Sequence, residues 1–222
     1  MNQHPGVIGL KLGMTQVVEE DGTVVPCTVI EARPVVVAKR SVDKDGYTAL
    51  VLGTGVRKEK HTNKPLQGFY KKTGGTPKRT LREFRCSVEE AAKYEVGAEL
   101  GVDAVFAQGQ FVDVRGISRG HGFTGVMRRH NFKGSRSQTH GTHEYQRHGG
   151  SIGGRKTPGR TFLGQGMPGQ HGNVTKSVLN QPVVRVLPEQ NLILVRGGVP
   201  GARNALVEVR GAVKKRGGLP KS

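Results

Sequence analysis

The chain has 222 residues and a formal net charge of +18 at pH 7, from 35 lysine and arginine residues against 17 aspartate and glutamate. Such an excess of positive charge points to a polyanionic partner. Only 5% of the residues are aromatic and there is no tryptophan, so we exclude a broad base-stacking platform. An apolar run long enough to cross a membrane and a secretory signal are not apparent, so we expect neither.

The first part of the chain predicts β-strands. Segments 7–18, 23–32, 34–40 and 47–55 are rich in β-branched and apolar residues, and the turn pairs Asp21-Gly22 and Asp45-Gly46 separate them. Residues 64–74 predict one or two helical turns. Residues 87–94 predict a short helix in which Ser87 and Glu90 have the spacing of a capping box. FVDVRGI, at 111–117, predicts a further strand.

The middle of the chain has a different composition. Residues 115–176 carry 11 basic residues and one acidic residue, whereas residues 1–114 carry 16 basic and 14 acidic residues. Within the middle, residues 118–172 contain 14 glycines and six of the eight histidines. Such a segment cannot bury enough apolar surface to offset its conformational entropy. A solvated surface loop is the alternative, but such a loop has no need to exclude acidic residues. We therefore expect 118–172 to contact a polyanion and to become ordered on binding it.

Apolar strand patterns return after this segment, in residues 181–201 and 204–213. The predicted fold is therefore a mainly β globular domain assembled from both ends of the chain, with a long basic loop leaving it and returning. Cys27 and Cys86 have no C-x-x-C partner, which indicates reduced thiols of a cytosolic protein. Cys27 lies among apolar residues and is expected to be buried.

Gly120, Gly122 and Gly125 have the G-x-G-x-x-G spacing of a dinucleotide site. The residues that follow have no apolar helical stripe and no acidic residue at the end of a next strand, so we reject that interpretation. Glycines also let a phosphate or a base edge approach backbone amides. With arginine and lysine beside them, an RNA or DNA backbone is the expected occupant.

His140, His143 and His148 do not match a standard zinc spacing and have no cysteine among them, so we expect no metal. A neutral imidazole that hydrogen-bonds or stacks on RNA is the better interpretation. A serine or cysteine nucleophile would need a base and an orienting acid nearby. Neither the two cysteines nor Glu144, the one acidic residue of 115–176, offers such an arrangement, so we expect no enzyme. No cofactor and no small-molecule substrate are predicted.

Several motifs together resemble the bacterial type of the ribosomal protein L three family. They include IGLKLGMTQV, DGYTALVLGTG, NKPLQGFY and NLILVRGGVPGA, and the most specific is FAQGQFVDVRGISRGHGFTGVMRR at 106–129. The resemblance covers nearly the whole chain.

The resemblance implies a translation-factor-like, six-stranded β-barrel domain with one or two short helices. Residues 1–117 would form its first part, 118–172 an rRNA-penetrating loop, and 173–222 its second part with a basic C-terminal tail. It further implies a structural constituent of the large subunit of the cytoplasmic ribosome, which binds 23S-type rRNA early in assembly. The loop would reach toward the peptidyl transferase centre. The implied partners are this rRNA and neighbouring large-subunit proteins, without a membrane.

The expected rRNA-binding residues lie on both limbs of the loop and at its root: Arg115, Ser118, Arg119, Gly120, His121, Gly122, Arg128, Arg129, Lys133, Arg136, His140, Arg147, Ser151, Arg155, Lys156 and Arg160. Relatives have a methylated glutamine where this chain has Gly154, so that modification is not expected. Two alternatives from other classes stay open here, a DNA-associated architectural protein and an enzyme of translation or RNA modification. Competition between rRNA and duplex DNA, and a nucleotide-binding assay, distinguish them.

Overall fold

The fold was analysed in a computed structural model that describes residues 5–137 and 139–215. The protein is mainly β, as predicted. The stretch Arg119–Val174 forms one compact unit, and the chain on either side of it forms the other, which we call the globular unit. Among the described residues, no helix is long and apolar enough to cross a membrane.

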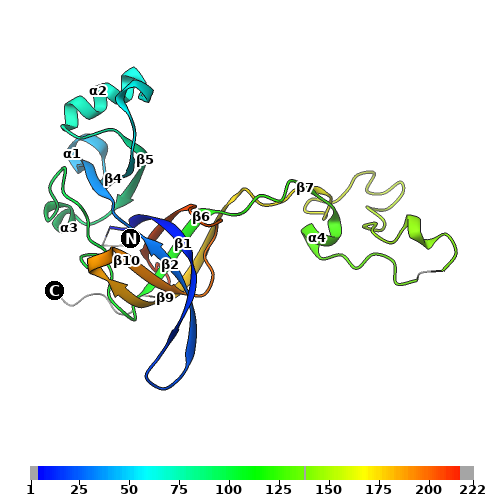
Figure 1. Ribbon diagram of the computed structural model, residues 1–222. Helices are drawn as coiled ribbons and strands as arrows, with labels where there is room; N and C mark the ends of the chain where they lie inside the picture. The colour runs from blue at the N-terminus through cyan, green and yellow to red at the C-terminus, as the bar shows by residue number, and fades with distance from the viewer. Residues whose placement is uncertain (1–4, 138, 216–222) are drawn as a thin grey trace. The chain divides into compact units, whose positions relative to one another are not determined.

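Six strands of the globular unit pair in a closed ring (Figure 1). In ring order they are β1 (Val7–Val18), β11 (Leu206–Gly211), β6 (Phe111–Ile117), β9 (Thr175–Leu187), β10 (Leu192–Arg196) and β2 (Val24–Glu31), and every neighbouring pair is antiparallel. The strands come from both ends of the chain, as predicted from the apolar segments. The expected turn between the first two strands is present, where the Asp21 carboxylate accepts a hydrogen bond of 2.9 Å from the Thr23 amide.

Alternate residues of the ring strands fill the core. Ile8, Ile30, Val114 and Ile193 are fully shielded from solvent. Cys27 is buried as predicted and Cys86 is half-buried, and both thiols are free. Burial raises the pKa of both thiols above the usual cysteine value, which keeps them in the unreactive thiol form at neutral pH.

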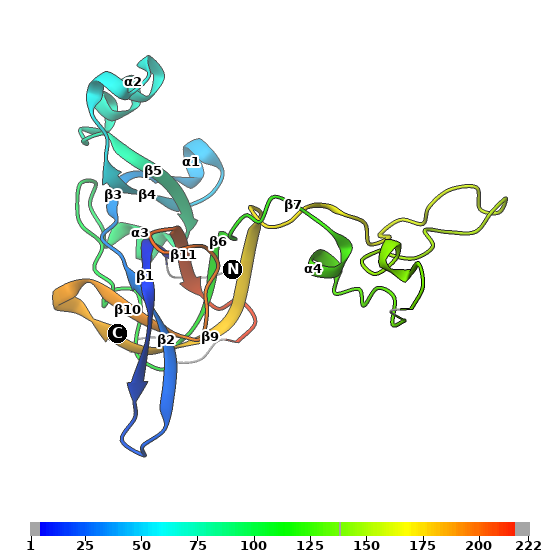
Figure 2. The same ribbon diagram turned by 45° about the vertical axis from the view of Figure 1, so that its right-hand side comes forward.

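Three further strands form a second sheet (Figure 2), with the order β3 (Val35–Arg40), β4 (Ala49–Val56) and β5 (Lys78–Arg85). These strands lie within 1–117, the predicted first part of the β-barrel domain, but outside the six-stranded ring. Their apolar residues Val36, Leu50 and Leu52 nevertheless belong to the same core cluster as Ile8 and Ile30. The strand β5 was not predicted, because five of its eight residues are charged and only Phe84 is buried.

Short helices connect the strands: α1 (Val42–Asp45), η1 (Glu59–His61), α2 (Lys64–Thr73), α3 (Val88–Ala92) and η3 (Pro188–Gln190). The predicted helix at 87–94 is confirmed in α3, where the Ser87 hydroxyl accepts a hydrogen bond from the Glu90 amide at 3.3 Å. This bond satisfies one of the amides that have no partner within the first turn of a helix.

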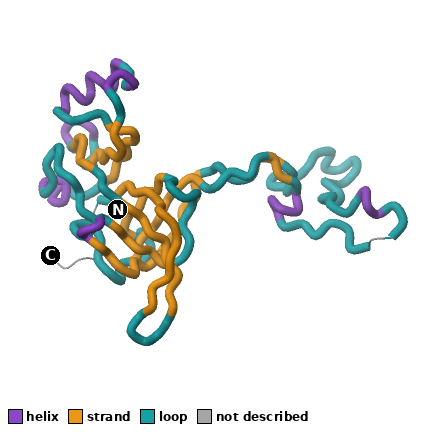
Figure 3. Tube along the Cα trace, in the orientation of Figure 1, coloured by secondary structure: helices purple, strands orange, loops and turns teal. Residues whose placement is uncertain are grey.

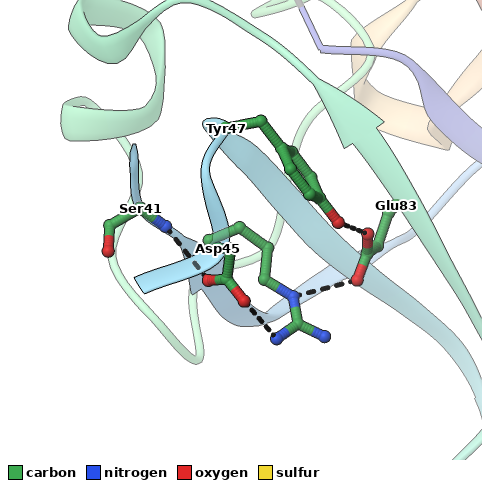
Figure 4. Close-up of polar contacts among 5 residues, drawn as sticks. Ser41, Asp45, Tyr47 and Glu83 are labelled. Atoms are coloured by element: carbon green, nitrogen blue, oxygen red, sulfur yellow. Dashed lines mark hydrogen bonds and ion pairs between the residues drawn. The ribbon is translucent and has the colours of Figure 1, made fainter. Parts of the chain in front are cut away.

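A polar cluster holds the α1 segment against β5 (Figure 4). The Arg40 guanidinium donates hydrogen bonds of 3.0 Å to Asp45 and to Glu83, and the Tyr47 hydroxyl donates one of 2.8 Å to Glu83. The bond to Glu83 raises the pKa of Tyr47, because the hydroxyl stabilises the carboxylate only while it keeps its proton. Arg40 is therefore an arginine whose charge is already balanced within the fold.

Candidate nucleic-acid interface

The unit Arg119–Val174 consists mainly of irregular chain (Figure 3), and its two limbs are joined near their root by backbone hydrogen bonds. The His121 amide donates to the His171 carbonyl, and the His171 amide donates to the Gly122 carbonyl, both at 2.9 Å. The short strands β7 (Phe123–Thr124) and β8 (Gly169–Gln170) continue this pairing. This segment therefore has more internal structure than its composition predicts.

Glycines let the two limbs come close together. Gly172 has a φ of +71°, and a Cβ atom on it would overlap the Arg119 carbonyl. A Cβ atom on Gly169 would lie 2.7 Å from Arg129 Nη1. The glycines of this segment were predicted to let phosphate approach the backbone. At Gly169 and Gly172 the structure gives a different reason, which is contact between the limbs. Gly120 and Gly122 are exposed, and phosphate contact there stays a prediction.

A single helical turn, α4 (Val126–His130), packs on the returning limb. The Arg129 guanidinium donates a hydrogen bond of 2.6 Å to the Met167 carbonyl, and His130 Nε2 lies 3.1 Å from the same oxygen. The Val126 side chain is buried. Sequence patterns did not predict α4, because one turn is too short to show a helical period.

Arg129 therefore has a role that the sequence analysis did not predict. It was assigned to rRNA, yet it is half-buried and holds the outgoing limb to the returning one through Met167. No pattern in the sequence indicated this role, because the carbonyl that Arg129 contacts lies 38 residues further along the chain. Any contact of Arg129 with a nucleic acid has to coexist with this hydrogen bond.

The other predicted site residues are distributed over the surface of both units. Arg115 is exposed on β6 of the globular unit, and Ser118 is half-buried just after that strand. The predicted residues that lie exposed within Arg119–Val174 are Arg119, Gly120, His121, Gly122, Arg128, Lys133, Arg136, His140, Arg147, Ser151, Arg155, Lys156 and Arg160. None of the ion pairs found among the described residues involves a cation of this unit. The positive charge of the exposed arginines and lysines in this unit is therefore available to an external anion.

His121 is held as a neutral imidazole. Arg128 Nη2 lies 3.1 Å from His121 Nδ1, and since a guanidinium only donates, Nδ1 is the unprotonated nitrogen. The ring also stacks on His171 with centroids 5.0 Å apart. Desolvation, followed by the charges of Arg128 and its neighbours, lowers the pKa of His121 below the usual histidine value. Its Nε2–H is left as a donor that persists at neutral pH.

His140, His143 and His148, which were considered and rejected as zinc ligands, are not brought together around one point. Over residues 5–137 and 139–215, no group of three or more histidine, cysteine, aspartate or glutamate side chains is placed to hold a metal ion. His148 instead forms a T-shaped ring pair with Tyr145, with centroids 5.4 Å apart. Tyr145 is 60% exposed, so this pair presents an aromatic surface to solvent.

Comparison with known proteins connects this architecture to a family. The family model described as "Ribosomal protein L3" matches residues 69–191, which include the whole unit Arg119–Val174. A protein of Sorangium cellulosum named "Large ribosomal subunit protein uL3" is 60% identical over 98% of this chain and 94% of its own. Proteins of the same name from Myxococcus xanthus and Acidothermus cellulolyticus are 49% and 48% identical, over 94% and 96% of this chain and 93% and 94% of their own.

These similarities extend through the globular unit and the basic segment alike. They define the class as that of ribosomal proteins, which are structural components and not enzymes. The chain belongs to the ribosomal protein L3 family.

Proposed function

We propose that this chain is a structural constituent of the large ribosomal subunit in the cytoplasm, and that it binds large-subunit rRNA directly and early in subunit assembly. The names of the relatives support the place in the large subunit. The observation that carries direct rRNA binding is the unit Arg119–Val174, whose exposed arginines and lysines have no ion pair within the described chain. Neighbouring large-subunit proteins are the other proposed partners.

We propose a separate role for each of the two units. The closed ring of six antiparallel strands supports a translation-factor-like barrel built from 1–117 and 173–222, with the second sheet inserted between β2 and β6. The segment 118–172 is the proposed rRNA-penetrating extension, directed toward the peptidyl transferase centre. The proposed basic tail lies mostly at 216–222, outside the described residues.

The proposed mechanism is neutralisation of phosphates where rRNA helices pack closely. Arginine offers forked donors that match a phosphate, and glycine-rich limbs without bulky side chains fit into narrow gaps. The limb pairing near His121 and His171 fixes the start of the extension before RNA binds. Less of the chain then has to be ordered on binding, which reduces the entropic cost.

Salt dependence of rRNA binding tests the electrostatic part. If about ten phosphates are neutralised, log affinity should fall against log salt concentration with a slope of about −7 to −9. Replacing Arg136, Arg147, Arg155 and Arg160 with glutamine should reduce that slope by about 3 to 4, because four contacts are removed. A slope near −2 for the unaltered chain would remove the electrostatic account.

The matched control replaces Lys39, Lys44, Arg185 and Arg203 with glutamine. These four residues are also exposed, and they lie in the globular unit. The control should keep the slope of the unaltered chain, and an equal loss in both variants would contradict the assignment of the extension. Duplex DNA added as a competitor should displace rRNA poorly. Efficient displacement would instead indicate a DNA-associated architectural protein, which would bind both nucleic acids.

Crosslinking within intact subunits tests the position of the extension. Crosslinks from 118–172 should map to rRNA near the peptidyl transferase centre. Crosslinks confined to rRNA on the solvent side would contradict deep penetration and leave only surface binding.

A further inference from the structure

A second cationic region lies in the globular unit, outside the proposed rRNA-binding residues. Residues 57–79 carry eight basic residues and one acidic residue, Glu59, whereas residues 80–114 carry three basic and seven acidic residues. The near-balance of charge over 1–114 therefore hides a strongly basic segment. We call its cationic side chains, together with one histidine, the α2 basic surface: Arg57, Lys58, Lys60, His61, Lys64, Lys71, Lys72, Lys78 and Arg79.

The backbone beneath the α2 basic surface is fixed by side-chain hydrogen bonds. The Gln67 amide donates to the carbonyls of Glu59 and Thr62, at 3.2 and 2.7 Å, and so joins η1 to α2. The buried Tyr70 hydroxyl accepts a bond of 3.1 Å from the Lys78 amide, which joins α2 to β5. The cations are thus presented on a framework that is already ordered.

The charges of this surface are exposed and unbalanced. All of its members except Lys78 are exposed to solvent. None of them forms an ion pair with a carboxylate among the described residues, whereas Arg40, Arg82 and Lys93 of the same unit do. Arg57 is held by the His61 carbonyl, to which its guanidinium donates bonds of 3.0 and 2.6 Å. Holding like charges together without counterions is unfavourable, and an external anion relieves that repulsion.

A hollow in the α2 basic surface is lined mainly by cationic side chains. It has a volume of about 590 Å³ and is lined by Val56, Arg57, Lys58, His61 and Arg79. Three of the five lining residues carry a positive charge and a fourth is an imidazole. A phosphodiester group placed there would lie beside guanidinium and ammonium donors.

We propose that the α2 basic surface binds the sugar–phosphate backbone of RNA, with one phosphate seated in the hollow beside Lys58 and Arg79. The proposal rests on the function proposed above and adds a second RNA-binding surface, in the globular unit. RNA is favoured over an acidic protein because protein interfaces are depleted in lysine and enriched in aromatic residues. This surface is rich in lysine, and Val56, at the edge of the hollow, is the one large hydrophobic side chain that is exposed within 56–79.

The test uses the full chain and a large-subunit rRNA transcript. The variant K58Q/K64Q/K72Q/R79Q removes four exposed cations and leaves Arg57, Gln67 and Tyr70 in place. We expect binding at least about tenfold weaker at physiological salt and a salt slope reduced by about 3 to 4. The control K39Q/K44Q/R185Q/R203Q, with the same loss of charge, should bind as the unaltered chain does.

A conservative variant separates charge from folding. K58R/K64R/K72R keeps the charge and should keep the affinity, and the unfolding midpoint of K58Q/K64Q/K72Q/R79Q should match that of the control. If the glutamine variant binds rRNA as tightly as the control does, the proposal is wrong. Equal loss in the arginine variant would also contradict it, because charge would then not be the cause.

Failure of this inference can be told apart from failure of the proposed function. If only the extension variant R136Q/R147Q/R155Q/R160Q weakens binding, the proposed function stands and the α2 basic surface is not an RNA site. If neither variant weakens binding, the proposed function fails as well. Crosslinks from Lys64 or Lys72 to a neighbouring protein instead of rRNA, in reconstituted subunits, would also overturn the proposal and assign the surface to a protein partner.

Discussion

At the scale of single residues, Asp113 shows how a carboxylate can be structural inside a basic protein. Leu179 and Asn180 of β9 lie opposite this one residue of β6, which makes a β-bulge, and Asn180 has a φ of +55°. The buried Asp113 carboxylate accepts hydrogen bonds from the Asn180 amide at 3.0 Å and from the Val213 amide at 3.3 Å. It therefore satisfies two backbone amides, one of which the bulge takes out of the regular ladder.

Replacing Asp113 with alanine should lower the free energy of unfolding by about 2 to 3 kcal/mol, because two amides lose a charged acceptor. Chemical denaturation followed by circular dichroism measures this. The control Asp43→Ala removes an exposed carboxylate for which the structure gives no hydrogen bond, and it should change the stability by less than about 0.5 kcal/mol. Equal effects of the two substitutions would show that the bulge does not depend on Asp113.

The protonation of His121 gives a second prediction at this scale. Desolvation and, after it, the cations beside the ring disfavour a charged imidazole, so the pKa of His121 lies below the usual value in the free protein. Arg128→Gln removes one of these cations and should raise the pKa of His121. An NMR titration of the imidazole resonances measures the shift, with Arg155→Gln as the control that leaves the pKa where it was. An unchanged or lower pKa in Arg128→Gln would contradict the contact between the two side chains.

At the scale of elements, the paired limbs of Arg119–Val174 predict unequal dynamics within one segment. The amides of His121 and His171 are hydrogen-bonded across the limbs, whereas residues 151–163 are exposed throughout. Amide exchange in the free protein should be slower at His121 and His171 than over 151–163. Uniformly fast exchange would favour the original expectation that RNA orders the whole segment.

Gly172→Ala should release this pairing. The left-handed backbone at Gly172 disfavours a Cβ atom, and the added methyl group would overlap the Arg119 carbonyl. We expect exchange at His121 and His171 to accelerate at least about tenfold, a loss of about 1.4 kcal/mol of local stability. Gly164→Ala is the control: it also has a positive φ, but a Cβ atom there meets nothing within 4 Å. Equal acceleration in the control would assign the effect to backbone strain alone.

The strands of the ring could be predicted from the sequence because alternating or continuous apolar residues mark them. The exception is the first half of β9, which begins at Thr175, six residues before the predicted apolar segment. The helix α3 could be predicted because Ser87 and Glu90 stand at capping distance. The strand β5 could not, since its charged residues face solvent and give no apolar pattern. The candidate site was predicted by charge and glycine content as a region. The role of Arg129 was not, because it depends on the Met167 carbonyl, which only the folded chain brings near.

At the scale of the whole molecule, the ring should not depend on the segment inserted into it. Ile117 at the end of β6 pairs with Thr175 at the start of β9, so the chain leaves and re-enters the ring at one strand pair. Replacing 118–174 with the two-residue turn Asn-Gly should therefore leave the ring folded, with an unfolding free energy no lower than that of the full chain. Denaturant unfolding measures this. A large loss of stability would show that the ring needs the segment.

Because the chain leaves and re-enters the ring at one strand pair, the inserted segment can vary in length. The entropic cost of a flexible insertion grows only with the logarithm of its length, by about 0.6 kcal/mol for each doubling. The connection between β6 and β9 can therefore be a short turn or many tens of residues at a similar entropic cost. The ring itself does not limit the length of the segment inserted between β6 and β9. That length can therefore match the depth to which the segment enters its proposed RNA partner.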